Sequence, residues 1–250
     1  MTETWLGQLP FLGLVLARCA GVCALAPPTG WAHFPPLLRL GVATALAVPL
    51  AALLAPHAPA RSLAPAAYLG LLAGNALVGL LIGGGLWLLV EAFRVAGRLT
   101  ELWLDGAGAS EQGPLSGFLH MVAVLFFVQL GGLRWLVVFL RQGCEVLPVT
   151  GGVSWHAVAG PWLQWPALML ATGLRVAAPM LLAVVLASAM AATLARAMGE
   201  VQISQVAPAL RFTVLVVVLG AIAPLLAGLA MGEMDRWANE LATALNRLSA

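Results

Sequence analysis

The charged residues best placed to do chemistry directly follow a run without charge at positions 66–90. Their spacing of three, four, three and four residues places all of them on one stripe of a helix. Ionisable groups in or beside a membrane segment are functional candidates. Two interpretations stay open: a contact surface that faces protein or a water-filled space, and a solvated face just outside the lipid. The stripe consists of Glu91, Arg94, Arg98, Glu101 and Asp105. Within it, Glu91 can pair with Arg94, and Arg98 can pair with Glu101.

The residue types that usually support catalysis or metal binding lack the required spacing. No histidine has a cysteine, histidine or carboxylate three or four residues away. Neither Ser110 nor Ser154 lies in a G-x-S-x-G motif. The chain contains no lysine, which excludes a P-loop. We therefore expect no enzymatic activity, no metal and no cofactor.

Composition indicates the environment of the chain. Of its 250 residues 62% are hydrophobic and 9% charged, against about 45–50% and about 25% in soluble domains. Mean hydropathy is +0.98, and the net charge is only +2. These values argue against a cytosolic enzyme, a disordered chain and a nucleic-acid-binding domain. They predict an integral membrane protein built from several apolar helices.

Glycine and proline divide the chain into apolar segments. We expect one all-α, polytopic membrane domain over 1–250, made of bent helical hairpins. The run at 161–195 is too long for one crossing, so a break is expected near Arg175–Pro179. The expected segments are 5–26, 40–55, 66–105, 115–140, 161–195 and 212–231, followed by an amphipathic tail at 232–250.

Smaller patterns predict local packing. Gly70 with Gly74, and Gly79 with Gly83, have the four-residue spacing that lets two helix backbones approach closely. Cys19, Cys23 and Cys144 are too few for a disulfide framework, so small packing roles are expected. In the tail, one apolar face and one polar face are expected. The apolar face contains Trp237, Leu241, Leu245 and Leu248, and the polar face contains Glu233, Asp235, Arg236 and Arg247.

A set of short motifs extends over nearly the whole chain. They are Ala17–Gly21 with Leu25–Pro27, Leu38–Gly41, Ala96–Asp105 with Pro114–Leu115, Gly131–Leu133, Leu147–Pro148, Leu174–Pro179, Leu194–Ala197 and Val201–Ile203. In order and spacing this set resembles the FliR/SctT family, the export-gate proteins of flagella and injectisome type III secretion systems. Asp105 precedes a glycine-containing loop without aromatic residues, which is more similar to injectisome members than to flagellar ones.

The resemblance implies a structural subunit and not an enzyme. Such proteins assemble with FliP/SctR-like and FliQ/SctS-like subunits into the pore through which unfolded proteins leave the bacterial cytoplasm. FlhB/SctU-like and FlhA/SctV-like components are further expected partners, together with the lipid membrane. The expected location is the bacterial inner membrane, with part of the protein raised toward the periplasm.

The resemblance also assigns roles to residues. The loop after the third apolar segment would close the pore. This gate loop comprises Leu104, Asp105, Gly106, Ala107, Gly108, Ala109, Ser110, Glu111, Gln112 and Gly113. The charged stripe would face a neighbouring subunit or the pore. An entrance hairpin would contain Arg196, Glu200, Gln202, Gln205 and Arg211.

One alternative function comes from a different class. A polytopic transporter or channel for small molecules, working alone, would also use broken helices with a charge near the middle of the membrane, as expected at Arg175–Pro179. An intramembrane enzyme is disfavoured by the lack of paired carboxylates or His/Cys clusters within a helical segment.

Overall fold

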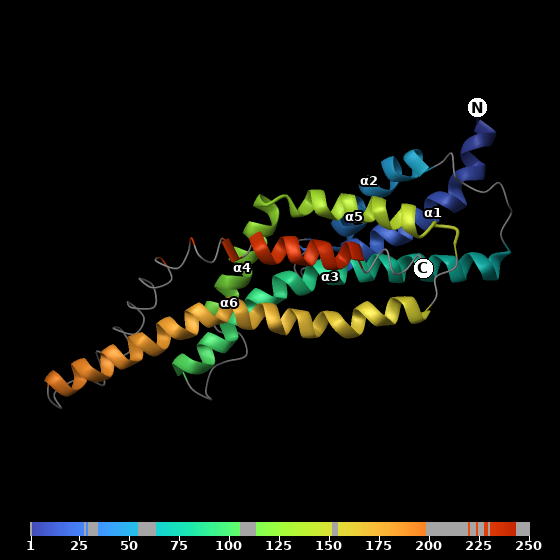
Figure 1. Cartoon of the computed structure of the whole chain (residues 1–250). Coiled ribbons are helices and arrows are strands. Elements are labelled where there is room, and N and C mark those ends of the chain that lie inside the picture. Colours follow the sequence, from blue (N-terminus) through green and yellow to red (C-terminus); the bar gives the residue numbers. More distant parts are fainter. Residues whose placement is uncertain are drawn as a thin grey trace. The chain divides into compact units, whose positions relative to one another are not determined.

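The computed structural model describes residues 2–27, 29, 35–54, 64–105, 114–151, 155–198, 220, 224, 228–229 and 231–243. These residues are almost entirely helical and include no strand, which confirms the all-α prediction. In chain order the long helices are α1 (Thr2–Leu25), α2 (Pro36–Leu54), α3 (Pro65–Asp105), α4 (Pro114–Gln129), α5 (Gly132–Val146) and α6 (Trp155–Met198) (Figure 1). A last helical stretch covers 231–243.

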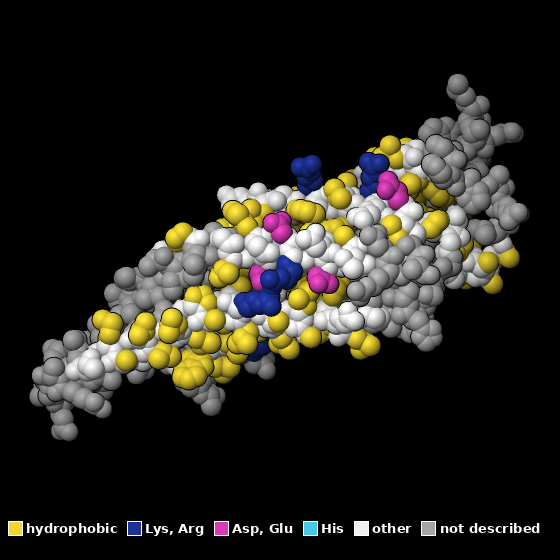
Figure 2. Space-filling model, in the orientation of Figure 1, with side chains coloured by type: hydrophobic (Ala, Val, Ile, Leu, Met, Phe, Trp, Pro, Cys, Tyr) yellow, Lys and Arg dark blue, Asp and Glu magenta, His cyan; other side chains and the backbone are white. Residues whose placement is uncertain are grey.

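Three of these helices have the length and hydropathy to cross a membrane. They are α2, the Pro65–Trp103 part of α3 and the Leu163–Met190 part of α6. The number rises to four if α4 and α5 together form one bent span. Hydrophobic side chains lie on the outside of the described helices and gather over α6, whereas charged side chains are few (Figure 2). Such large apolar surfaces require lipid or a protein partner to cover them.

Proline and glycine set several helix boundaries. Pro36, Pro65 and Pro114 each occupy the first helical position, where the missing N–H costs nothing. The apolar segment expected at 115–140 is divided, because the chain turns before Gly132 and forms α4 and α5, which are bent by 66°. Gly131 has φ 81°, in the left-handed region that glycine adopts without strain.

The prediction of a break near Arg175–Pro179 is wrong. Helix α6 continues through Pro179 and has 44 residues, beginning at Trp155. Proline removes one backbone donor, and membrane helices tolerate this loss where neighbouring groups satisfy the freed carbonyl. The expected segment at 212–231 lies mostly outside the described residues.

The chain divides into two compact units. The first unit comprises 1–90, 127–167 and 235–250. Within it α1 packs on α2, and Gly85 of α3 lies against Trp165 of α6 and Leu241 of the last helical stretch. Trp165 and Leu241 are buried there, which confirms Leu241 as part of the apolar face of the tail.

The backbones of α1 and α3 come unusually close in the first unit. A Cβ atom built on Gly79 would overlap the carbonyl oxygen of Arg18, and one on Gly83 would overlap that of Val22. From the other side, a Cβ on Gly21 would overlap the Ala76 carbonyl. The close approach predicted for Gly79 and Gly83 is therefore confirmed, whereas a Cβ on Gly70 would meet open space.

The second unit comprises 91–126 and 168–234. Gly97 of α3 lies against the backbone of Ser116, at the start of α4. Gly173 of α6 lies against Ala92 and Val95 on α3. Leu115, Leu119 and Met180 form a buried cluster between α4 and α6. The C-terminal part of α3 thus has both α4 and α6 packed against it.

The glycine contact predicts opposite effects for two matched substitutions. Gly79→Ala should lower thermal stability in detergent, because the new methyl group meets the Arg18 backbone and overpacking costs about 1–3 kcal/mol. Gly70→Ala should leave stability unchanged or raise it slightly, because alanine favours helix by about 1 kcal/mol. Equal melting temperatures for the two variants would contradict the close approach of α1 and α3.

Candidate functional site: buried charges between apolar helices

Four charged side chains are buried in the described part of the chain: Arg18, Glu91, Glu101 and Glu233. In apolar surroundings a buried charge is costly unless hydrogen bonds or an opposite charge satisfy it. The contacts of these four residues therefore show which groups stabilise charges inside the protein.

Arg18 of α1 is 0% exposed and joins three helices of the first unit. Its Nε donates to Oδ1 of Asn75 on α3 at 3.0 Å. Its Nη1 donates to the carbonyl oxygens of Gly143 and Leu147, at 2.8 and 3.0 Å. These carbonyls belong to the C-terminal end of α5, where the helix dipole places partial negative charge. No described carboxylate pairs with Arg18, so this helix end takes the place of a counter-ion.

Asn75 completes this group of contacts. Its Nδ2 donates to the carbonyl oxygen of Val149 at 2.8 Å, just after α5, and to that of Leu71 on its own helix. The Cys144 thiol lies 3.4 Å from Arg18 Nη1. We call Arg18, Asn75 and the Gly143–Val149 backbone the arginine bridge. Reasoning from the sequence missed it, and its only signal was that Arg18 alone interrupts the first apolar run.

In the second unit, the charged stripe on α3 has buried and exposed members. Glu91 is buried and forms the expected ion pair with Arg94. The Nδ1 atom of His120, from α4, lies 4.0 Å from the Glu91 carboxylate. Glu91 and Glu101 are thus buried, whereas Arg94 and Arg98 are exposed, and the side chain of Asp105 lies outside the described residues.

Glu101 has a different partner from the one its spacing suggested. Its Oε1 accepts hydrogen bonds from the backbone N–H groups of Leu115 and Ser116, at 2.6 and 3.0 Å. The expected pair with Arg98 is absent from the described residues. Proline at the first position of α4 has no N–H, and Gly113 before it has no side-chain oxygen for a cap. Glu101 thus caps α4 from fourteen positions earlier in the chain.

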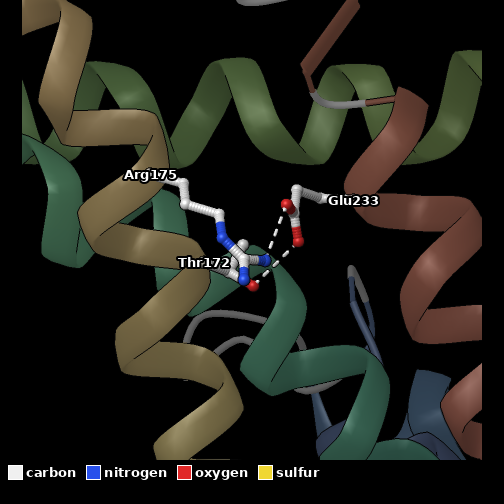
Figure 3. A network of polar contacts seen from close by, with 3 residues as sticks. All are labelled: Thr172, Arg175 and Glu233. Carbon is white, nitrogen blue, oxygen red and sulfur yellow. Dashed lines mark hydrogen bonds and ion pairs between the residues drawn. The ribbon is translucent and has the colours of Figure 1, made fainter.

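A third polar contact joins α6 to the last helical stretch (Figure 3). Glu233 accepts a hydrogen bond from the hydroxyl of Thr172 at 3.1 Å and pairs with Arg175 at 3.2 Å. Glu233, expected among the polar residues of the amphipathic tail, is buried. It precedes the buried Trp237 by four residues, so both lie on one helix face.

Several predicted residues lie outside the described part. These are gate-loop residues 106–113, Glu200, Gln202, Gln205 and Arg211 of the entrance hairpin, and Leu245 and Leu248 of the tail. The side chains of Leu104, Asp105 and Arg196 are likewise outside it, although their backbones belong to α3 and α6. The structure does describe both ends of the gate loop, because α3 ends at Asp105 and α4 begins at Pro114.

The polar contacts described above hold helices together. Among the described residues, no group of three or more His, Cys, Asp or Glu side chains could hold a metal ion. Three of the four buried charges, Arg18, Glu101 and Glu233, connect segments that are distant in sequence. They join α1 with α3 and α5, the end of α3 with the start of α4, and α6 with the last helical stretch. These contacts position helix ends, among them the start of α4.

Comparison with known proteins adds two findings. A family model described as "Bacterial export proteins, family 1" matches residues 9–237. A search of curated proteins found no match.

The arginine bridge predicts a large stability loss on substitution. Arg18→Met should destabilise the protein, because it leaves the Asn75 oxygen and the Leu147 carbonyl without this donor, at about 1–3 kcal/mol each. The Gly143 carbonyl keeps the hydrogen bond from the Leu147 N–H. Arg141→Gln is the matched control: it removes an exposed pair with Glu145, worth about 0–1 kcal/mol. Thermal unfolding in detergent measures both. Similar melting temperatures for the two variants would show that the bridge contributes little.

Proposed function

Because the chain belongs to bacterial export proteins family 1, the FliR/SctT family, and is thus a component of a bacterial export apparatus, we propose that it is a core subunit of a type III export gate. The family match, which covers residues 9–237, carries this proposal. The multi-pass helices and large exposed apolar surfaces support it, since a subunit of a membrane assembly needs both.

The proposal includes partners and location. FliP/SctR-like and FliQ/SctS-like subunits would complete the pore, with FlhB/SctU-like and FlhA/SctV-like components beside it. Unfolded proteins would be the cargo, and the bacterial inner membrane the location. The aromatic-free sequence after Asp105 favours an injectisome over a flagellum. The role is structural and involves no enzymatic step.

The gate loop at 104–113 would close the pore, and the Glu101 cap supports this role. A closing segment needs a mobile middle and fixed ends. Glycines at 106, 108 and 113 permit backbone changes at low steric cost. Glu101 fixes the far end by holding the first two N–H groups of α4. The close contact of Gly97 with Ser116 fixes the spacing of the two helices below the loop. The hairpin at 196–211 would lie at the cytoplasmic entrance.

A transporter working alone has less support. Its main argument was a helix broken near Arg175–Pro179, and α6 is continuous there. Arg175 is moreover paired with Glu233. Family membership also places the chain in an export apparatus.

Two changes test the gate role. Deletion of residues 106–113 should make the assembly leak ions, because it removes the closing segment. Glu101→Ala should also raise ion permeability, because it leaves two N–H groups of α4 unsatisfied, at about 1–3 kcal/mol each. Glu101→Gln should leak less than Glu101→Ala, since the amide oxygen still accepts hydrogen bonds. A membrane-potential dye in cells that express the whole assembly measures the leak.

The control is Glu145→Ala, which removes an exposed carboxylate on α5 far from this cap in sequence. It should behave as wild type. Recovery of the intact complex from each strain separates a leak from failed assembly. Normal ion permeability in the deletion variant, with the complex assembled, would overturn the gate role.

A further inference from the structure

The outward face of α5 is charged along most of its length. Arg134, Arg141 and Glu145 are exposed and lie seven and four positions apart, so they share one side of the helix. The opposite side is buried and apolar, with Leu136 and Phe139 among its members. Charged side chains accordingly stand out along α5 in Figure 2. Lipid hydrocarbon does not solvate such a face, whereas water does.

The arginine bridge fixes the level of α3 at which α5 ends. Asn75 of α3 donates to the Val149 carbonyl at 2.8 Å, and the bridge joins it to Gly143 as well. These residues all belong to the first unit. Arg141 and Glu145 each lie two positions from Gly143, which is about 3 Å along the helix axis. The exposed charges at this end of α5 therefore lie near the level of Asn75.

That level lies inside the hydrocarbon layer wherever the bilayer falls on the uncharged run of α3. The run covers 66–90, whereas about 20 residues at 1.5 Å each cross the roughly 30 Å of hydrocarbon. Every stretch of about 20 residues taken from this run contains 71–85. Asn75 then lies about 6–14 Å from the nearer edge of the hydrocarbon.

At the same level, another side of α3 is apolar and exposed. Two positions turn a helix by about 200°, so the exposed Ala73 points away from Asn75. Leu69, one turn earlier on the side of Ala73, is 66% exposed. The first unit thus presents two unlike surfaces at one level. The surface at Ala73 suits lipid, and the surface at Arg141 and Glu145 does not.

The charges at this level need a polar solvent more than they need a partner. Nε of Arg141 donates to Oε1 of Glu145 at 2.9 Å, so the two side chains neutralise each other. They remain 69% and 55% exposed. A neutral pair attracts no oppositely charged protein surface, but hydrocarbon around it would carry the desolvation cost of both ions.

We propose that the outward face of α5 at Arg141 and Glu145 borders a water-filled space at the depth of the hydrocarbon layer. Ionisable side chains at membrane depth characteristically face such spaces. Water and small ions enter along α5, whereas lipid covers the side of α3 at Ala73. The inference requires α3 to cross the bilayer and makes no use of the gate loop. The water-filled space and the gate role can therefore fail independently.

Thiol labelling in membranes tests this placement. Glu145→Cys and Ala73→Cys are compared in the assembled complex, in open membrane fragments that let a charged methanethiosulfonate reagent reach both sides. Glu145→Cys should react, because a thiol in water forms the reactive thiolate. Ala73→Cys should stay unlabelled, because hydrocarbon excludes the charged reagent. The native chain is the blank, since its own cysteines are all buried: Cys19, Cys23 and Cys144.

Val138→Cys is a second variant that leaves the ion pair intact. Val138 is 44% exposed and lies seven positions before Glu145, on the same side of α5, so this cysteine should react as well. Reaction of both Glu145→Cys and Ala73→Cys would place this level outside the bilayer and overturn the proposal. Absence of reaction at Glu145→Cys and Val138→Cys would also overturn it, because lipid or a neighbouring subunit would then cover the face.

Discussion

A guanidinium group buried among apolar helices needs hydrogen-bond acceptors. Neutral acceptors such as backbone carbonyls can supply these bonds without the burial of a second charge. Arg18 finds them at the C-terminal end of α5, in the carbonyl oxygens of Gly143 and Leu147, where the helix dipole places partial negative charge. One side chain thereby binds the end of α5 through Nη1, and Asn75 brings α3 into the same contact through Nε of Arg18. The bridge can form only because Gly79 and Gly83 let α1 and α3 approach so closely that a methyl group would not fit between them.

In the second unit a charged side chain again binds a helix end, but the charge is negative. Helix α4 begins with proline after glycine and has no cap of its own, and the Glu101 carboxylate supplies the missing acceptor. A cation thus lies at a helix C-terminus in one unit and an anion at a helix N-terminus in the other. Both contacts hold helix ends, and the one at Glu101 holds the base of the loop that we propose to close the export pore.

The sequence predicts well those features that one segment determines by itself. The helix at 66–105 follows from its uncharged run, and the close approach of another helix at Gly79 and Gly83 follows from glycine spacing. The turn at Gly131 does not interrupt the apolar run, because hydrophobic residues lie on both sides of it, and only the two adjacent glycines mark it. The continuity of α6 at Pro179 is hidden because neighbouring segments decide whether a proline interrupts a membrane helix.

The partners of buried charges are harder to predict, because they depend on contacts between distant segments. The stripe spacing correctly pairs Glu91 with Arg94, which are neighbours on one helix. It wrongly pairs Arg98 with Glu101, because the start of α4 offers that carboxylate two uncapped N–H groups. The burial of Glu233 could have been inferred from its four-residue distance to Trp237. Its partners on α6 could not.

The proposed role in an export gate is tested most directly by the composition of the complex that contains this chain. The chain would be tagged at its C-terminus, co-expressed with its genomic neighbours, extracted in mild detergent and weighed intact by native mass spectrometry. We expect one copy in a large assembly with FliP/SctR-like and FliQ/SctS-like subunits. A stable monomer or homodimer without those subunits would contradict the role.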